Sequence, residues 1–214
     1  MSIIVPTIMA ETIDQLREAL ERVRPFAKRI HFDLADGEFA PTLLLPPGSL
    51  YWPEGIQADI HMMYARPSEQ LPYILQMRPN MIILHAEAEE DIVPQLKFIK
   101  EQGVRAGVAL LKTTVPLDVE EAIKLADHVM IFSGDLGKFG GTASMMQLEK
   151  VRLVKKIHPE VEIGWDGGAV LENAYTLSQG GVDIINVGGA INKADSPIDT
   201  YSALVKEINK SGVL

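Results

Sequence analysis

The sequence contains no cysteine. A disulfide framework and a thiolate metal site are therefore excluded, and the absence fits a protein of the reducing cytoplasm. No run of about 18 apolar residues occurs, so we expect no membrane-spanning helix. The first residues also lack a basic segment followed by a long apolar one, which argues against a secretory signal peptide. Together these absences predict a cytoplasmic protein.

Positive charge is also scarce. Lys and Arg number 20 against 29 Asp and Glu, which gives a formal net charge of −9. This balance argues against a nucleic-acid partner, because binding a phosphate backbone needs a basic face. A small phosphorylated molecule stays compatible, since backbone N–H groups in a glycine-rich turn or at a helix N-terminus can hold one phosphate.

The order of apolar segments predicts the fold. Short runs rich in Val, Ile and Leu are typical of buried parallel strands, and here they alternate with amphipathic stretches. The predicted strands are Ile3 to Ile8, Arg29 to Leu34, Ala58 to Met63, Asn80 to Ala86, Val104 to Leu111, His128 to Phe132, Val161 to Trp165 and Val182 to Val187. The predicted helices are Thr12 to Arg24, Ser68 to Met77, Asp91 to Gln102, Val119 to Ala126, Met146 to His158, Leu171 to Gln179 and Ile198 to Lys210. So many strand–helix units in 214 residues favour one closed (β/α)8 TIM barrel over residues 1–214, not an open doubly wound sheet.

Acidic and imidazole side chains stand at the ends of several predicted strands. His31 and Asp33 end the second strand, and the alternation of a strand places both on one face. His61 ends the third strand and Asp166 follows the seventh. Barrel enzymes carry their catalytic residues at this end of the strands. A single histidine there is more often a core group, but two His and two Asp together predict one divalent ion such as Zn, Mn, Fe or Co.

The other histidines are less informative. His85 ends the fourth strand and is followed by Glu87. It fits equally a group that supports a metal ligand, a hydrogen-bonded core residue, or a substrate contact. His128 begins a strand and His158 ends a helix, so we expect both to lie away from the barrel mouth and in solvent.

Glycine-rich turns follow the last three predicted strands. They occupy Ser133 to Thr142, Gly167 with Gly168, and Gly188 with Gly189. Glycine pairs usually mean only tight turns. In barrels, however, the loops after strands seven and eight often bind phosphate, and the position of these turns predicts such a site.

These motifs resemble those of the ribulose-phosphate 3-epimerase family. His31 to Pro41 is similar to the family motif after the second strand, and Asp59 to Met63 to that of the third. Asp166 to Gly168 and Gly188 to Ala190 resemble the last two motifs. Pro6-Thr7 stands where the family usually has Pro-Ser. The similarity covers nearly the whole chain.

The resemblance implies a set of functional residues. The metal ligands would be His31, Asp33, His61 and Asp166, with the two aspartates also catalytic as acid and base. Substrate and phosphate contacts would be Thr7, His61, Phe139, Gly140, Gly141, Gly167, Gly168, Gly188 and Gly189. It further implies a homo-oligomeric isomerase of carbohydrate metabolism, acting in the pentose phosphate pathway.

The expected chemistry is inversion at C3 of a ketose phosphate, D-ribulose 5-phosphate to D-xylulose 5-phosphate. The metal would stabilise an enediolate as a Lewis acid. One aspartate would remove the C3 proton, and the other would return a proton to the opposite face.

Some segments depart from the family pattern. The loop after the sixth strand usually reads Asn-Pro-Gly-Phe-Gly-Gly, whereas Asp135 to Gly141 carries one extra residue. The loop after the fifth usually has Asn-Pro-Gly-Thr, whereas Leu111 to Val115 reads Leu-Lys-Thr-Thr-Val. Ala35 and Phe132 replace methionines that line the family's site, and Met63 keeps one.

These departures leave two alternatives open, and a third enzyme class is also considered. One is an epimerase of another ketose phosphate, such as a hexulose 6-phosphate, and a second is a non-catalytic sugar-phosphate- or metal-binding barrel. The third is the decarboxylase and aldolase branch of phosphate-binding barrels, which uses an Asp-x-Lys-x-x-Asp pattern. The segment Asp33 to Asp36 has no lysine, which argues against the third.

Overall fold

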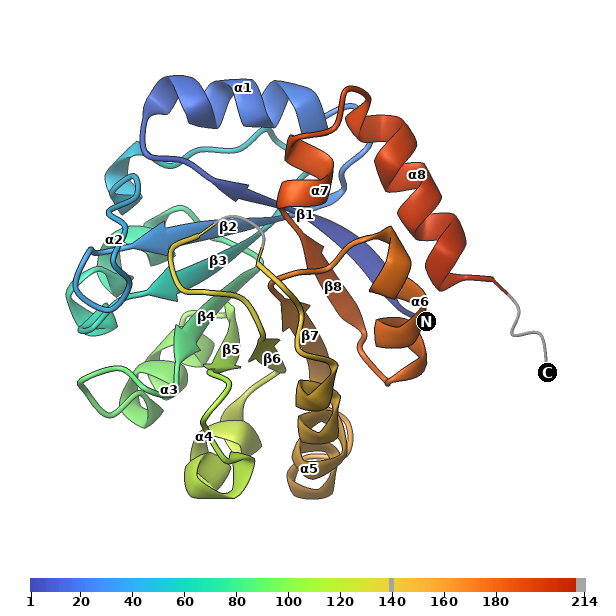
Figure 1. Ribbon diagram of the computed structural model, residues 1–214. Coiled ribbons are helices and arrows are strands. Elements are labelled where there is room, and N and C mark those ends of the chain that lie inside the picture. The colour runs from blue at the N-terminus through green and yellow to red at the C-terminus, as the bar shows by residue number, and fades with distance from the viewer. Residues whose placement is uncertain (139–140, 211–214) are drawn as a thin grey trace.

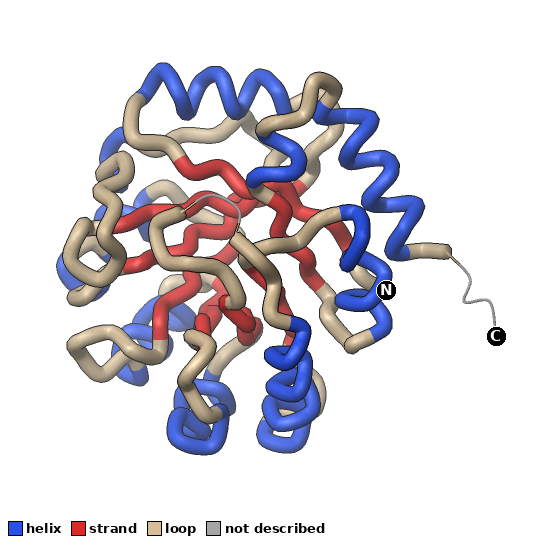
Figure 2. Tube along the Cα trace, in the orientation of Figure 1, coloured by secondary structure: helices blue, strands red, loops and turns tan. Residues whose placement is uncertain are grey.

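The fold is a closed barrel of parallel strands. A computed structural model describes residues 1–138 and 141–210. Within these residues the strands pair in sequence order, and β1 also pairs with β8 to close the barrel. The strands are β1 (Ile3–Met9), β2 (Arg29–Ala35), β3 (Gln57–Met63), β4 (Met81–His85), β5 (Arg105–Leu110), β6 (His128–Phe132), β7 (Glu162–Asp166) and β8 (Ile184–Val187). The predicted (β/α)8 TIM barrel is confirmed, and the helices surround the strands (Figures 1 and 2).

The helices agree with the amphipathic pattern. They are α1 (Ile13–Val23), α2 (Leu71–Gln76), α3 (Val93–Glu101), α4 (Glu120–Leu125), α5 (Glu149–Ile157), α6 (Leu171–Gln179), α7 (Gly189–Asn192) and α8 (Pro197–Ile208). Helix α6 has the predicted bounds, α8 begins one residue earlier than predicted, and most of the other ends are shorter. The helix predicted from Ser68 is divided into a 3-10 turn, Pro67–Glu69, and α2, each with a proline in its first turn. The short helix α7 was not predicted, because its glycine-rich sequence is typical of a turn.

Most of the hydrophobic core lies between the barrel and its helices. Leu16, Leu20 and Val23 form the buried stripe of α1, and Trp165 of β7 is fully buried. Inside the barrel a smaller apolar group consists of Met81, Ile83, Ala109, Met130 and Phe132. This packed interior separates the polar groups at the two ends of the barrel.

An ionic cluster occupies the end of the barrel where the strands begin. The Arg29 Nε donates to Asp59 Oδ2 at 2.5 Å, and another guanidinium nitrogen contacts Glu162 Oε1 at 3.1 Å. His128 Nδ1 lies 2.8 Å from the same Glu162 oxygen, and the His128 side chain is buried. The expectation that His128 lies in solvent was therefore wrong. His158 is half-buried, with Nδ1 3.2 Å from the Ile123 carbonyl oxygen.

Among the described residues, no helix combines the length and apolar character that crossing a membrane requires.

Candidate metal centre and substrate pocket

Two histidines and two aspartates meet at the C-terminal end of the barrel. His31, Asp33, His61 and Asp166 each offer one ligand atom, and these atoms all lie within 4.8 Å of one another. His31 and His61 are fully buried, and Asp166 is 8% exposed. The four residues predicted to be metal ligands are thus brought together, from β2, β3 and β7.

The strand register explains this convergence. Asp33 of β2 pairs with His61 of β3, so the two side chains lie side by side on the inner face. His31 precedes Asp33 by two positions and therefore points to the same face. Asp166 is the last residue of β7 and reaches the cluster from another part of the barrel.

The donor atoms fit a cation. His61 Nδ1 lies 2.8 Å from Asp33 Oδ1 and 4.0 Å from Asp166 Oδ2, and His31 Nε2 lies 3.2 Å from Asp33 Oδ1. The contact of His31 Nε2 with Asp33 is an ion-pair distance without hydrogen-bond geometry, so among the described residues neither ring nitrogen of this buried histidine has a hydrogen-bond partner. A buried polar atom without a partner is costly unless something else satisfies it. Imidazole nitrogens and carboxylate oxygens aimed at one point are the donors that Zn, Mn, Fe or Co would accept.

The two carboxylates of the cluster differ in acidity. Burial raises the pKa of Asp33, but interactions with His31 and His61 outweigh burial and hold this pKa well below its usual range. Burial and the negative charge of Asp33 raise the pKa of Asp166 to about 6. Two neighbouring carboxylates with separated pKa values are a common arrangement for acid and base roles.

Behind the cluster, a chain of hydrogen-bonding groups extends toward the loop after β5. His61 Nε2 lies 2.8 Å from His85 Nε2, and His85 Nδ1 lies 3.3 Å from Glu87 Oε2. The His85 ring is packed against Phe39 and Phe132, with ring centroids 4.7 and 5.7 Å away. Burial lowers the pKa of His85 to about 4. Three roles were left open for His85. Because its ring contacts His61, the structure supports the role of a group that holds a candidate metal ligand.

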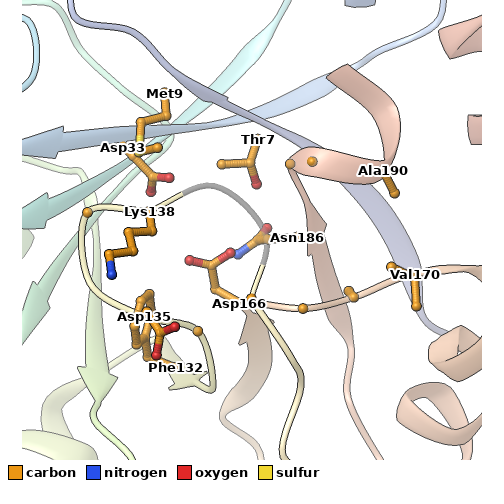
Figure 3. A pocket seen from close by; sticks show the side chains of 18 of the residues that line it. Thr7, Met9, Asp33, Phe132, Asp135, Lys138, Asp166, Val170, Asn186 and Ala190 are labelled. Atoms are coloured by element: carbon orange, nitrogen blue, oxygen red, sulfur yellow. The ribbon is translucent and has the colours of Figure 1, made fainter. Parts of the chain in front are cut away.

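A pocket of about 230 Å³ opens beside the cluster. Figure 3 shows Asp33 and Asp166 directed into the same space, with Thr7 and Asn186 beside them. The predicted contact residues that line this pocket are Thr7, Gly141, Gly167, Gly168, Gly188 and Gly189. Phe139 and Gly140, also predicted as contacts, lie outside the described residues.

The glycines after β7 are required by packing. A Cβ at Gly167 would lie 2.0 Å from the Gly134 backbone nitrogen, and one at Gly168 would lie 2.2 Å from the Ala143 nitrogen. Both glycines also have positive φ, 96° and 70°, which disfavours other residues. The turn after β7 thus lies directly against the loop after β6, and this contact together with the positive φ accounts for both glycines.

Several pocket residues were not predicted from the sequence. Asn186 of β8 is buried, and its Oδ1 has no hydrogen-bond partner among the described residues. An asparagine inside a Val/Ile strand was the available signal. Lys138 and Lys193 also line the pocket and bring positive charge to it in an acidic chain. Met9 lines it beside Met63, and nothing in the sequence distinguishes Met9 from a core residue.

Fold and site together define a (β/α)8-barrel protein with a candidate His/Asp metal centre at the active-site end. A sequence model of the Ribulose-phosphate 3 epimerase family matches residues 3–192. Ribulose-phosphate 3-epimerase of Aquifex aeolicus (strain VF5) is 28% identical over 221 residues, which cover 100% of this chain and 99% of that protein. The cytoplasmic isoform of Oryza sativa subsp. japonica is 29% identical over 220 residues, covering 97% and 95%.

This chain belongs to the ribulose-phosphate 3-epimerase family. The predicted family and its class, epimerases acting on carbohydrates, are confirmed. Among solved structures, KGPDC from Streptococcus mutans matches with a TM-score of 0.72 at 11% identity, covering 97% of each chain. A 3-keto-L-gulonate-6-phosphate decarboxylase from Vibrio cholerae matches with a TM-score of 0.67 at 14% identity, again covering 97% of each chain. These two likenesses concern the fold alone.

Proposed function

We propose that this chain is a metal-dependent epimerase that inverts C3 of D-ribulose 5-phosphate to give D-xylulose 5-phosphate. The observation that carries the proposal is the cluster of His31, Asp33, His61 and Asp166 beside a pocket lined by glycine turns. Family membership supplies the class of reaction, and the cluster supplies groups suited to it.

Asp33 and Asp166 would move the proton. They stand on β2 and β7, which are not neighbours in the barrel, so their carboxylates approach the pocket from different sides (Figure 3). One takes the proton from C3, and the other delivers a proton to the opposite face, which inverts the configuration. A divalent metal held by the four ligands would supply Lewis-acid stabilisation of the negative charge that develops on the substrate oxygens.

The far end of the pocket suits a phosphate. Backbone N–H groups of Gly167, Gly168, Gly188 and Gly189 are the donors that we assign to it. The side chains of Lys138 and Lys193 would add positive charge. We propose that Thr7, whose buried hydroxyl has no hydrogen-bond partner among the described residues, contacts the sugar.

The test is exchange of the C3 proton followed by NMR. Metal-loaded protein is mixed with D-ribulose 5-phosphate in D₂O, and the C3 signal is followed beside the appearance of xylulose 5-phosphate. We expect exchange and product together, and we expect both to stop when a chelator removes the metal.

The loops after β5 and β6 depart from the family pattern, so the identity of the sugar is tested separately from the reaction. Exchange on a hexulose 6-phosphate but not on D-ribulose 5-phosphate would keep the mechanism and replace the substrate. No exchange on any ketose phosphate, with metal bound, would contradict the proposal and favour a non-catalytic binding protein.

A further inference from the structure

The hydrogen-bonded chain behind the candidate metal centre has a direction. Two imidazole nitrogens, His61 Nε2 and His85 Nε2, lie 2.8 Å apart in a buried environment. A hydrogen bond between them needs one hydrogen and one lone pair, so one ring must donate and the other accept. The groups that face the far nitrogen of each ring, His85 Nδ1 and His61 Nδ1, decide which ring donates.

His85 Nδ1 faces a carboxylate. Its neighbour at 3.3 Å is Glu87 Oε2, which only accepts hydrogen bonds when ionised. Nδ1 therefore carries the hydrogen, and His85 Nε2 keeps its lone pair. Without a metal, Asp33 Oδ1 can accept from His61 Nδ1 at 2.8 Å. With a metal bound by both groups, Nδ1 must keep its lone pair for the ion, and His61 then donates from Nε2 to His85.

Glu87 is itself held in place. Its Oε1 accepts from the Leu111 N–H at 2.9 Å and from the Thr114 hydroxyl, both in the loop after β5. Lys150 of α5 donates to the Leu111 carbonyl and, at 3.0 Å, to the Lys112 carbonyl of the same loop. Among the described residues, the hydrogen-bond partners of the Glu87 carboxylate can all donate, which favours its ionised form and fixes its orientation.

We propose that Glu87 and His85 are positioning residues that hold His61 in the tautomer whose Nδ1 binds the metal, with the loop after β5 as the anchor of Glu87. This extends the carboxylate–histidine–metal arrangement by one imidazole ring. The inference rests on the proposed function only in that the cluster binds a divalent ion. It assigns a role to the Leu-Lys-Thr-Thr segment, Leu111 to Thr114, in which the chain departs from its family's usual loop.

Glu87→Gln gives a sharp test, because a glutamine amide cannot satisfy the same partners. Leu111 and Thr114 both donate to Oε1, so the glutamine oxygen takes that place and its NH₂ faces His85 Nδ1. His85 must then accept at Nδ1 and carry its hydrogen on Nε2. His61 is forced to accept at Nε2 and to carry its hydrogen on Nδ1, where it blocks the metal.

The experiment measures zinc affinity and imidazole tautomers on the full chain. Zinc binding is followed by competition with a chromophoric chelator, and the tautomers by long-range ¹H–¹⁵N NMR with and without zinc. We expect Glu87→Gln to bind zinc about 10- to 100-fold more weakly, with the hydrogen of His85 moved from Nδ1 to Nε2. The matched control is Glu89→Gln, two residues away and exposed, which should bind like the wild type.

A second pair of variants keeps the test decisive if Glu87→Gln does not fold. Thr114→Val removes one donor to Glu87 and should weaken zinc binding, whereas Thr114→Ser keeps the hydroxyl and should restore it. Wild-type zinc affinity in folded Glu87→Gln, a zinc-bound wild type in which His85 carries its hydrogen on Nε2, or a wild-type chain that binds no zinc would each overturn the inference. Zinc bound with the expected tautomers, but no proton exchange on any ketose phosphate, would support the positioning role of Glu87 and His85. It would contradict only the proposed epimerase activity.

Discussion

At the scale of the residue, Asp33 and Asp166 carry the proposed chemistry. We expect Asp33→Asn and Asp166→Asn each to lower turnover by at least about 10²–10⁴-fold, because an amide cannot exchange the C3 proton. Both variants should keep the barrel, since the apolar core does not depend on either carboxylate. Proton exchange measures the first effect and circular dichroism the second.

The control for these variants is Asp14→Asn, an exposed aspartate of α1 far from the cluster. It should exchange protons at the wild-type rate. Near wild-type turnover in Asp33→Asn or Asp166→Asn would refute the roles assigned to the two aspartates.

Some residues of the candidate site could be predicted from the sequence, and others could not. His31, Asp33, His61 and Asp166 could be selected because strand alternation and the barrel rule place them at one mouth. The position of Lys193 in the pocket could not be predicted, because it depends on the unforeseen short helix α7. Glu87 was noticed, but its contact with Thr114 joins residues 27 positions apart through tertiary structure.

At the scale of the element, helix α1 illustrates a boundary that local chemistry sets. Thr12 accepts a hydrogen bond from the Gln15 N–H at 3.2 Å, and the Gln15 side chain accepts from the Thr12 N–H in return. We expect Thr12→Ala to lower the free energy of unfolding by about 1 kcal/mol, because one helix N–H loses its partner. Urea unfolding measures this as a lower midpoint with an unchanged slope.

Thr12→Ser is the matched control, because it keeps the hydroxyl and should retain most of the stability. An unchanged midpoint in Thr12→Ala would show that the capping box contributes nothing measurable.

The strands were predicted more accurately than the helix ends. All the strands were identified from apolar runs, since burial on both faces leaves a strong signal, although β8 begins at Ile184 and not at Val182. Helix ends were less certain: Pro67 and Pro72 restrict the helix predicted from Ser68 to a 3-10 turn and a shorter α2.

At the scale of the whole molecule, the ionic cluster at the N-terminal end makes stability depend on pH. Burial lowers the pKa of His128, although Glu162 and Asp59 raise it in part and Arg29 lowers it further. The unfolded chain, with an ordinary histidine pKa, therefore binds more protons than the folded one as pH falls through about 6.5. We expect the free energy of unfolding to fall between pH 7.5 and 5.5, and to fall less in His128→Gln.

Urea unfolding of both proteins at the two pH values measures the difference, and an identical pH dependence would rule out His128 as a cause.

Glu162 affects stability in a separate, lower pH range. Burial raises its pKa, but His128 and Arg29 outweigh burial and hold it well below the usual range, so its contribution is lost only under acid conditions below about 4.5. The cluster was not foreseen, because its members come from β2, β3, β6 and β7 and only the closed barrel brings them together.

The interlocked turn at Gly167 and Gly168 has a consequence for how this barrel can be altered. Because the backbone of Gly134 and Ala143 fills the space where side chains would stand, the loops after β6 and β7 behave as one module. A chimera that imports only one of them from a relative would bring together two mismatched halves. An exchange of substrate preference should succeed only when both loops are transplanted as a pair.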